Sequence, residues 1–514
     1  MAKNPPFRRV LIANRGEIAV RVARGLRELG IESIAVHSDV DARCAHVLQA
    51  DHAIALGGNT AAESYLDVQK ILDAARRCGA EAIHPGYGFL SENSAFVRAV
   101  RAAGLVFIGP NPEAMDRLGG KKAAREEAIA AGVPVIPGTE QDHGDAGLIT
   151  FAKQIGLPVM VKASAGGGGR GMRMVEREQD LAEALAAGRR EAKASFGDDR
   201  MILERAVFPA RHIEIQMFGD QHGEVVSLHE RECSVQRRHQ KVLEESPSAV
   251  VDEALRQRMG EAAIRLGKRV GYDNAGTAEF LLDPQGNFYF LEVNTRLQVE
   301  HPVTELVTGV DLVHLQVHVA AGGKLTELLR GKDLRPRGHA IEARICAEAP
   351  ERGYVPAAGL LRLVREAEGP GVRVDSGVYT GWDVPPFYDS MFAKLIVWAP
   401  DRATACTRLS QALRDTAYLG IETNVDFLRR VVDDAAFRSA ALSTDMLKHR
   451  ADLANGPGAG PGDEVLAAAV LCQALARNDG SGAAGGGGNG SGGSGAATAV
   501  WQALPGFRLF EGAR

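Results

Sequence analysis

Two acidic residues, Glu279 and Glu292, lie on either side of a turn-forming sequence and could together bind a metal ion. A hairpin with the loop 284–287 puts their carboxylates directly opposite each other on one face of a sheet. The same register pairs Asp283 with Phe288 and Leu281 with Phe290. Because opposed carboxylates repel each other, a bound divalent cation would stabilise the pair, and hard oxygen ligands suit magnesium. A solvated, mildly destabilising pair is the alternative interpretation.

The residues that follow alternate between polar and apolar side chains. The polar positions are Glu292, Asn294, Arg296, Gln298 and Glu300, and the positions between them are Val293, Thr295, Leu297 and Val299. This period of two predicts a strand that continues to residue 300 with all five polar side chains on one face. Alternation commonly means only a half-exposed strand. An anion site beside a metal, however, gains charge stabilisation from Arg296 and a potential general base in Glu300.

A glycine-rich segment, residues 162–171, lies between two apolar runs that are strand candidates. Gly166, Gly168 and Gly171 have the spacing of a dinucleotide-binding loop, but that loop must open a helix, and here a second strand follows. The segment is therefore predicted to be the tip of a hairpin. Its bare amides could approach phosphate oxygens while Lys162 adds a positive charge. A loop that binds nothing remains the alternative.

A basic segment, residues 231–241, carries four full positive charges and a histidine. These residues are Arg231, Arg237, Arg238, Lys241 and His239. Such a run is typical of a solvated loop or a nucleic-acid patch. Beside the glycine-rich hairpin and the carboxylate pair, it supplies what a polyanionic nucleotide and a small anion need. Cys233, within this segment, is interpreted as structural because no base and orienting partner accompany it.

The composition limits the possible classes of protein. The chain has 514 residues, a formal net charge of −5, 45% apolar and 24% charged residues. These values predict three or four folded domains at about 150 residues each and disfavour a nucleic-acid partner. No apolar run reaches the ~18 residues of a membrane span, and the N-terminus lacks the apolar core of a signal peptide. Six scattered cysteines without a CxxC pair predict reduced thiols and a cytoplasmic location.

Residues 9–110 alternate strands with amphipathic helices, which predicts an α/β fold with a doubly wound parallel sheet. The expected strands are 9–13, 31–36, 82–84 and 105–108, and the expected helices are 18–29, 65–78 and 92–104. The segment 84–93 follows the third strand, where ligands bind in such sheets, although a Gly/Pro turn capped by Ser91 explains most of it. Later helices are expected at 121–131, 402–415 and 424–432. A short apolar helix at 464–477 and a flexible linker at 478–499 end the pattern.

Several long segments, in order, resemble the biotin carboxylase component of biotin-dependent carboxylases, a family of the ATP-grasp superfamily. The segments are 10–19, 84–93, 162–171, 231–241, 292–304, 338–344 and 388–391. The similarity covers residues 7–450 and is closest to the α subunits of 3-methylcrotonyl-, propionyl- and acetyl-CoA carboxylases. It implies an α/β (α+β overall) architecture with four parts. These are a Rossmann-like domain at 1–119, an ATP-grasp domain at 120–333 with a flap at about 136–207, a β-rich C-terminal domain at 334–450, and a linker with a truncated extension at 451–514.

The resemblance also implies roles for individual residues. ATP would be bound by Lys121, Lys162, Gly168, Gly169, Glu204, Arg205, Ala206, Val207, His212, Gln236 and His239. Mg²⁺ or Mn²⁺ would be bound by Glu279, Glu292 and Asn294. Bicarbonate would be seated by Lys241, Arg296, Gln298 and the amide of Val299. Glu300 would deprotonate bicarbonate, and Arg344 would stabilise the enolate of the biotin ureido ring.

The implied reaction has two steps. Bicarbonate attacks the γ-phosphate of MgATP to give carboxyphosphate, which yields CO2 and phosphate; biotin, deprotonated by that phosphate, then attacks CO2. The chain has no Met-Lys-Met biotinylation motif. Biotin is therefore expected on a carrier protein or domain of another chain, with a carboxyltransferase subunit as a further partner and a homodimer as the assembly. Gly120 and Ala165 depart from the family pattern, and activity is expected to survive both changes.

Three alternatives remain open. The chain could be the carboxylase subunit of a two-chain pyruvate carboxylase, a different ATP-grasp ligase, or a catalytically inactive ATP-binding regulatory subunit. Arg344 and the segment 384–391 disfavour a different ligase, and the intact set of charged site residues disfavours an inactive subunit. Neither the acyl-CoA substrate nor the identity of the carrier can be read from the sequence.

Overall fold

The computed structural model describes residues 5–455, except 140, 164–172, 197 and 449, and the single residue 471. Gly168 and Gly169 therefore lie outside the described residues, as do the predicted helix at 464–477 and the linker at 478–499. None of the helices within the described part of the chain is long and apolar enough to cross a membrane.

Five parallel strands form the N-terminal sheet, in the order β3-β2-β1-β4-β5. They are β1 (Arg9–Ile12), β2 (Glu32–His37), β3 (His52–Ala55), β4 (Ala82–His84) and β5 (Val106–Phe107). The helices are α1 (Gly16–Glu28), α2 (Ala45–Gln49), α3 (Val68–Cys78) and α4 (Ser94–Ala102). The doubly wound sheet is thus confirmed, although α2 and β3 were not predicted. Helix α4 is capped by Asn93, which accepts from the Phe96 amide, so the predicted cap by Ser91 is wrong.

The carboxyl ends of β1 and β4 lie side by side where the strand order reverses, the usual ligand position in such sheets. Asn14 follows β1, and its side-chain amide donates to the carbonyls of Pro85 and Tyr87, each at 2.7 Å. These bonds fix the segment after β4. A side chain on Gly86 would collide with Asn14, because an added Cβ would lie 2.9 Å from its Nδ2.

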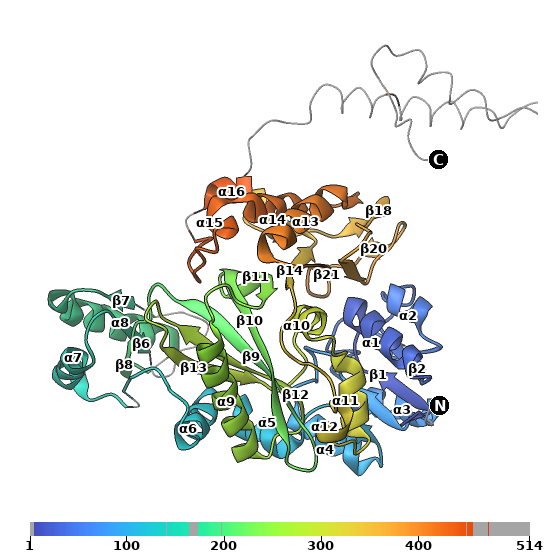
Figure 1. Cartoon of the computed structure of the whole chain (residues 1–514), viewed down its shortest axis with the longest axis horizontal. Coiled ribbons are helices and arrows are strands. Elements are labelled where there is room, and N and C mark those ends of the chain that lie inside the picture. The colour runs from blue at the N-terminus through green and yellow to red at the C-terminus, as the bar shows by residue number, and fades with distance from the viewer. Residues whose placement is uncertain are drawn as a thin grey trace, which may run out of the picture. The chain divides into compact units, whose positions relative to one another are not determined.

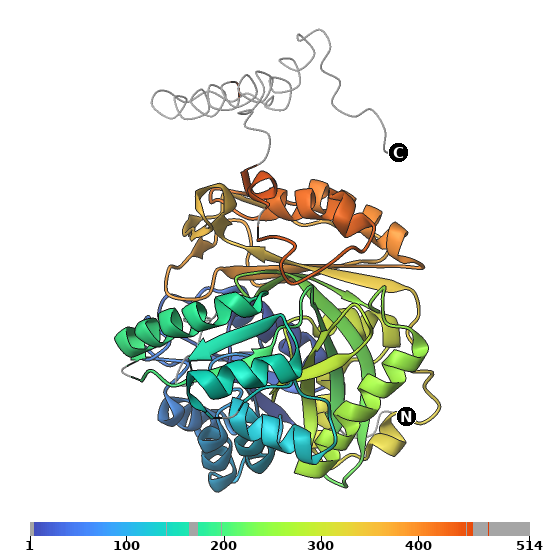
Figure 2. The same cartoon turned by 90° about the vertical axis from the view of Figure 1, so that its left-hand side faces the viewer.

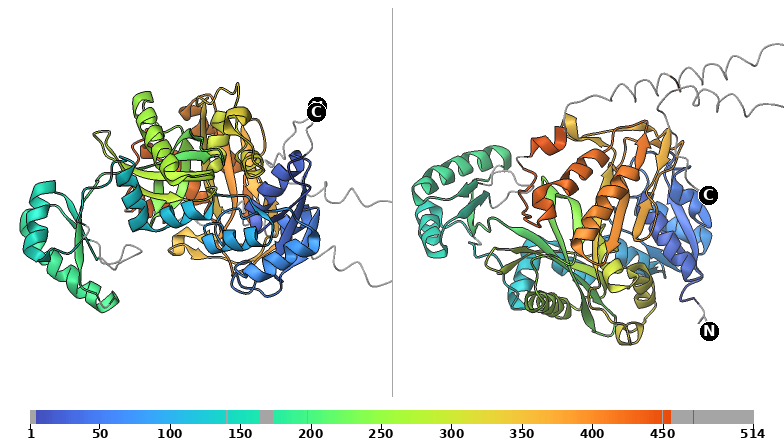
Figure 3. Two further views of the ribbon diagram at one scale, coloured as in Figure 1. Left: turned by 90° about the horizontal axis from the view of Figure 1, so that it is seen from below. Right: turned by 45° about the horizontal axis from the view of Figure 1, so that its top comes forward.

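A small antiparallel sheet, β7-β6-β8, carries the base of the glycine-rich hairpin. Its strands are β6 (Val159–Ala163), β7 (Arg173–Val175) and β8 (Met201–Arg205). Helices α7 (Gly144–Ile155) and α8 (Leu181–Phe196) pack on it, as the teal part of Figure 3 shows. The predicted pairing of strands around the glycines is confirmed. Before this sheet come α5 (Pro112–Gly119) and α6 (Lys121–Ala130), and a short 3-10 helix (Glu178–Asp180) precedes α8.

The central sheet has eight strands, in the order β13-β12-β9-β10-β11-β14-β21-β19 (Figure 1). The first five in chain order are β9 (Arg211–Gly219), β10 (Val225–Arg237), β11 (Gln240–Ser246), β12 (Asn274–Leu282) and β13 (Phe288–Asn294). The other three are β14 (His339–Cys346), β19 (Val372–Ser376) and β21 (Met391–Ala399). Since β11 pairs with β14, the sheet continues across the predicted boundary between residues 333 and 334. That boundary remains a prediction.

Helices cover this sheet and connect its strands. They are α9 (Glu253–Val270), α10 (His301–Thr308), α11 (Leu312–Ala320) and α12 (Leu325–Leu328). Helix α9 packs on β9 and β10, and α10 packs on β14 and β10. Asp252 caps α9 by accepting from the Leu255 amide, and Gly271 ends it in the left-handed conformation, as helix-end chemistry requires.

The C-terminal part adds short strands and four helices. The strands are β15 (Glu348–Ala349), β16 (Val355–Pro356), β17 (Gly359–Leu360), β18 (Leu363–Arg365), β20 (Asp383–Val384) and β22 (Ala417–Leu419), with a 3-10 helix at Pro350–Arg352. The helices are α13 (Arg402–Asp415), α14 (Val425–Asp433), α15 (Ala435–Arg438) and α16 (Ala451–Asn455). Helix α13 packs on β21 and β14 and lies above the strands in Figure 2. Both predicted helices of this part are confirmed.

The hairpin β12–β13 partly corrects the predicted register. Glu279 does lie opposite Glu292, but Leu281 faces Tyr289 and Leu282 faces Phe288. The predicted pairs Asp283–Phe288 and Leu281–Phe290 are therefore wrong. A β-bulge next to Glu279 shifts the register by one residue, and the shift aligns the two glutamates despite the different turn.

The strand predicted to continue to residue 300 ends at Asn294 instead. The amide of Thr295 donates to the Glu92 side chain at 3.0 Å, not to a neighbouring strand. Glu300 immediately precedes α10, whose first turn contains Pro302. The predicted alternation holds only as far as Leu297: Val293, Thr295 and Leu297 are buried as predicted. Beyond them Gln298 and Glu300 are buried as well, and Val299 is half-buried, so the predicted polar and apolar faces are wrong there.

Candidate active site

A single lysine lies at the centre of the site. The Nζ of Lys241 is 2.5 Å from Glu214 Oε2, 2.8 Å from Glu279 Oε1 and 2.6 Å from Glu300 Oε1. The lysine is on β11, and two of the glutamates are on β9 and β12, so the sheet order brings them together. The three carboxylates are buried.

Lys241, Glu279 and Glu300 favour their charged forms. Burial opposes the ammonium form, but the three carboxylates raise the pKa of Lys241 well above its usual value. Burial also opposes the charged form of Glu300, yet Lys241 and Arg344 hold the pKa of Glu300 well below its usual range. The pKa of Glu279 is likewise lowered by Lys241 and His212 against the effect of burial. Arg231 also pairs with Glu214 and Arg344 with Glu300, so three cationic side chains contact the three carboxylates.

The predicted metal ligands lie at one side of this cluster, since Glu279 belongs to both. Glu279 accepts from the Asn294 amide at 2.9 Å, and its other oxygen is 3.2 Å from His212 Nε2. Glu292, opposite it, lies 3.4 Å from the exposed Lys121 Nζ. Two carboxylates and a side-chain amide offer hard oxygen donors, so these residues fit magnesium. His212, Glu214 and Glu279 also have ligand atoms close enough to share one ion.

Arg296 joins the predicted metal ligand Asn294 to the N-terminal part of the chain. Its guanidinium donates to Asn294 Oδ1 at 2.9 Å, to Gln298 Oε1 at 2.7 Å and to Glu92 Oε2 at 2.9 Å. Glu92 was not predicted as a site residue. It lies in the segment 84–93, which the sequence singled out, but its pairing with a residue 204 positions away could not be read from spacing.

Arg344 lies on the other side of Glu300. Its guanidinium donates to Glu300 Oε2 at 2.9 Å and to Glu244 Oε1 at 2.6 Å. Burial raises the pKa of Glu244 to about 7, although Arg344 opposes the rise. Glu342 lies opposite Glu244 in the sheet, and burial raises its pKa well above the usual value. Neither Glu244 nor Glu342 was predicted, because an isolated acid on a strand gives no distinctive signal.

Some of the residues expected to bind ATP lie on or directly after the strands of the small sheet. Lys162, at the base of the glycine-rich hairpin, forms an ion pair with Glu204 of the adjacent strand β8. The strand ends at Arg205, and the Ala206 amide donates to the Pro158 carbonyl at 2.9 Å. Val207 continues the same segment. This segment is therefore held beside the strand that carries Lys162, and its role in binding a nucleotide base remains a prediction.

The basic segment is divided between the site and the surface. Gln236 is buried and lies opposite Lys241 in the β10–β11 pair. His239 is exposed at the tip of that hairpin, in the left-handed conformation with φ +68°. Arg231 is fully buried and donates to Glu214 at 2.5 Å. Burial raises the pKa of the Cys233 thiol well above its usual value, which supports its structural interpretation.

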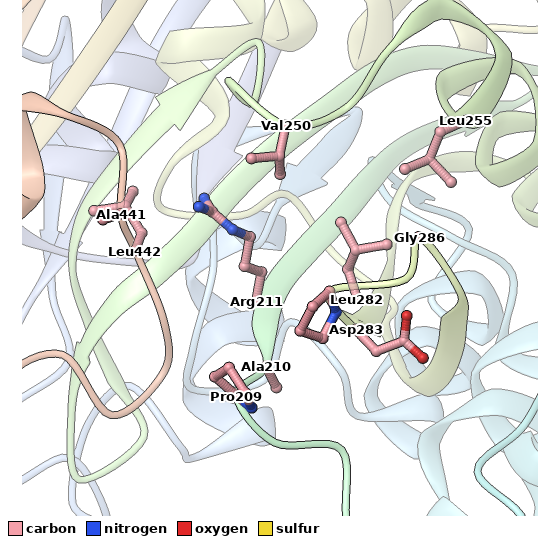
Figure 4. A pocket seen from close by; sticks show the side chains of 11 residues that line it. Pro209, Ala210, Arg211, Val250, Leu255, Leu282, Asp283, Gly286, Ala441 and Leu442 are labelled. Atoms are coloured by element: carbon pink, nitrogen blue, oxygen red, sulfur yellow. The ribbon is translucent and has the colours of Figure 1, made fainter.

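A separate cavity of about 340 Å³ lies outside this cluster (Figure 4). None of its lining residues is a predicted site residue. Its two charged side chains already have partners: Arg211 donates to Glu232 and to the Ala440 carbonyl, and Asp283 accepts from amides of its own turn. The cavity therefore has no charged group available for a ligand.

Three family models match successive parts of the chain. The biotin carboxylase N-terminal domain matches residues 6–115, the carbamoyl-phosphate synthase L chain ATP-binding domain matches residues 120–328, and the biotin carboxylase C-terminal domain matches residues 342–449.

Similar proteins cover nearly the same range. A biotin carboxylase of Nostoc sp. is 48% identical over 86% of this chain and 99% of its own length. The rat mitochondrial methylcrotonoyl-CoA carboxylase subunit alpha is 46% identical over 91% of this chain, which spans 64% of that subunit. A solved biotin carboxylase domain dimer of the Hydrogenobacter thermophilus 2-oxoglutarate carboxylase, in complex with MgADP, ADP and bicarbonate, is 41% identical with a TM-score of 0.78. The match covers 88% of this chain and 99% of that one.

The parallel N-terminal sheet, the glycine-hairpin sheet and the carboxylate–lysine cluster define an ATP-dependent ligase of the ATP-grasp class. The chain belongs to the biotin carboxylase family.

Proposed function

We propose that the chain uses MgATP and bicarbonate to carboxylate biotin carried by another chain, as a subunit of an acyl-CoA carboxylase. The observation that carries this proposal is the position of Lys241, which bonds both Glu279 of the metal pair and Glu300 beside Arg344. The ammonium of Lys241 thus connects the groups that would hold the metal with the groups that would contact biotin.

Bicarbonate fits between Lys241, Arg296 and Gln298. The two cationic side chains and the side-chain amide of Gln298 suit a small planar anion, and the backbone N–H of Val299 adds a donor. Glu300 then accepts the bicarbonate proton. Its pKa is low while Lys241 and Arg344 bond to it. An anion that takes over those contacts would remove their stabilisation of the carboxylate and thereby increase its basicity.

Glu279 and Glu292, with Asn294, would hold Mg²⁺ or Mn²⁺, which when bound neutralises phosphate charge. ATP would lie between the central sheet and the flap. The residues assigned to it are Lys121, Lys162, Gly168, Gly169, Glu204, Arg205, Ala206, Val207, His212, Gln236 and His239. Closure of the flap would exclude water from the labile carboxyphosphate.

Arg344 would stabilise the enolate of biotin after exchanging a contact with Glu244 or Glu300 for the ureido oxygen. The similarity to a methylcrotonoyl-CoA carboxylase subunit alpha supports an acyl-CoA carboxylase, with a biotin carrier and a carboxyltransferase as partners and a homodimer as the assembly. A cytoplasmic location is consistent with the five cysteines that the structure describes as free. The four predicted domain ranges belong to the same proposal.

The experiment is ADP release by the purified chain with MgATP, measured with and without bicarbonate and free biotin. The proposal predicts release that requires bicarbonate and increases with biotin. Turnover insensitive to biotin would favour a different ligase, and absent turnover in a folded, ATP-binding protein would favour an inactive regulatory subunit. Activity of the reconstituted complex on acyl-CoA rather than pyruvate separates an acyl-CoA carboxylase from a two-chain pyruvate carboxylase.

A further inference from the structure

A second buried lysine lies directly behind the predicted bicarbonate seat. Lys394, on β21, has no exposed surface, and its Nζ is 2.9 Å from the carbonyl oxygen of Val299. This bond joins the C-terminal part of the chain to the turn between Gln298 and Glu300. A fully buried ammonium is costly unless it has defined partners, so its position requires an explanation.

Ion pairing alone does not explain this position. Nζ is closer to the Val299 oxygen than to Glu17 Oε2, at 3.4 Å, or to Asp375 Oδ2, at 3.8 Å. Asp375 already accepts two bonds from Arg373. Both oxygens of Glu17 are buried and have no hydrogen-bond partner among the described residues. The best-placed partner of the ammonium is therefore the backbone carbonyl.

Two side chains together fix the peptides on either side of Val299. The His301 ring contacts the Gln298 carbonyl at 2.7 Å, and that carbonyl shares a peptide plane with the Val299 N–H. Lys394 holds the Val299 carbonyl, which shares the next plane with the amide of Glu300. Because each plane is rigid, these two bonds orient both the Val299 donor and the residue that carries the base.

The sheet places Lys394 beside the predicted biotin contact. Lys394 lies opposite Arg344 on one side and Asp375 on the other, so the three form one row across β14, β21 and β19. Because Lys394 also bonds to Val299, this row fixes the position of the 298–300 turn relative to the strand that carries Arg344. Both sides of Glu300 are thereby anchored to the same part of the sheet.

We propose that Lys394 is a positioning residue for the bicarbonate step. It holds the 299–300 peptide so that the Val299 amide and the Glu300 carboxylate face the anion together. This inference rests on the proposed function. It adds a residue from the C-terminal part of the chain to a site otherwise built from the central part.

The test compares bicarbonate and ATP kinetics in variants that remove the donor without leaving a new buried charge. Lys394→Met with Glu17→Gln removes the ammonium and its nearest carboxylate together, and Glu17→Gln alone is the reference. The double variant should raise the KM for bicarbonate and lower kcat, each by roughly tenfold or more, because misplaced reacting groups lose rate steeply. The KM for ATP should change by less than about threefold, because the contacts of Lys394 are with Val299, Glu17 and Asp375, none of which is a predicted ATP-binding residue.

A second variant keeps a donor without the charge. Lys394→Gln with Glu17→Gln should recover part of the lost bicarbonate affinity, because an amide can still donate to the Val299 carbonyl. Lys268→Met, which removes a half-exposed lysine paired with Glu224, is the matched control and should keep both KM values. Thermal unfolding of each variant is recorded alongside.

The outcomes separate the two proposals. Wild-type protein without bicarbonate-dependent ADP release would defeat the proposed function itself. An active wild type with an unchanged bicarbonate KM in the Lys394→Met double variant would overturn the positioning role, whatever its thermal stability. Equal losses of ATP and bicarbonate affinity, or unfolding of both double variants, would show that Lys394 serves only the fold.

Discussion

Substitution of Glu300 by glutamine tests the chemistry assigned to the centre of the site. The side chain is buried, with one oxygen 2.6 Å from Lys241 Nζ and the other 2.9 Å from Arg344 Nη2. Glutamine keeps the size and can still accept from Arg344. It cannot accept a proton, and its amide group would face the ammonium of Lys241.

The expected loss follows from these contacts. Removal of a general base typically reduces turnover by about 10²–10⁴, or roughly 3–5 kcal/mol of transition-state stabilisation. The lost charge-assisted bond to Lys241 contributes about 1.5–3 kcal/mol to folding. Part of this is offset because Glu214 and Glu279 still neutralise Lys241 with less mutual repulsion. The protein should therefore fold and bind MgATP while turning over far more slowly.

The assay is steady-state ADP release over a range of bicarbonate concentrations, with nucleotide binding measured separately. Glu224→Gln, a surface glutamate paired with Lys268, is the control for loss of one carboxylate and should behave as wild type. Turnover of Glu300→Gln within about threefold of wild type would refute the role of the base. A loss of ATP affinity with unchanged kcat would also contradict it.

Three further predictions address the neighbouring groups. Arg296→Ala should leave ATP binding nearly intact but reduce kcat by about 10²-fold or more, because Arg296 contacts Glu92, Asn294 and Gln298 rather than the predicted phosphate-binding lysines; weakened nucleotide binding with normal kcat would contradict this. Glu279→Gln should raise the magnesium concentration needed for half-maximal activity, and an unchanged requirement would remove Glu279 from the metal site. Burial raises the pKa of Glu17 to about 7, against the opposing effect of Lys394, whereas the pKa of a glutamate in the unfolded chain is near 4.5. The folded protein therefore binds a proton at Glu17 more tightly than the unfolded chain does. The protonated Glu17 side chain therefore contributes its full stabilisation below about pH 4.5, and this contribution is lost as the pH rises through 7. Glu17→Gln should flatten the dependence of Tm on pH between about 5 and 7. An unchanged slope would mean that Glu17 is ionised throughout.

The N-terminal sheet could be predicted because its strands and helices have distinct hydrophobic periods. Val10, Leu11 and Ile12 form a continuous apolar strand, and the helix from Gly16 buries the predicted apolar positions Ile18, Val22 and Leu26. The strand His52–Ala55 was missed because it lies at the sheet edge and most of its residues are exposed, which weakens the apolar signal.

The site was only partly predictable for a different reason. The opposed pair Glu279–Glu292 was inferred from a hairpin with the loop 284–287, but the bulge beside it depends on packing that spacing does not encode. Glu92, Glu244 and Lys394 reach the site from distant parts of the sequence. Arg344 was assigned only through the family resemblance, because an isolated arginine on a strand has no chemical signature.

Direct transfer of carbon from bicarbonate to biotin tests the central claim. The purified chain is incubated with MgATP, [¹⁴C]bicarbonate and free biotin, and the acid-labile label bound to biotin is measured against ADP released. The account predicts labelled carboxybiotin that requires ATP and disappears in Glu300→Gln. Bicarbonate-dependent ADP release without any label on biotin would contradict the assignment of biotin as the acceptor.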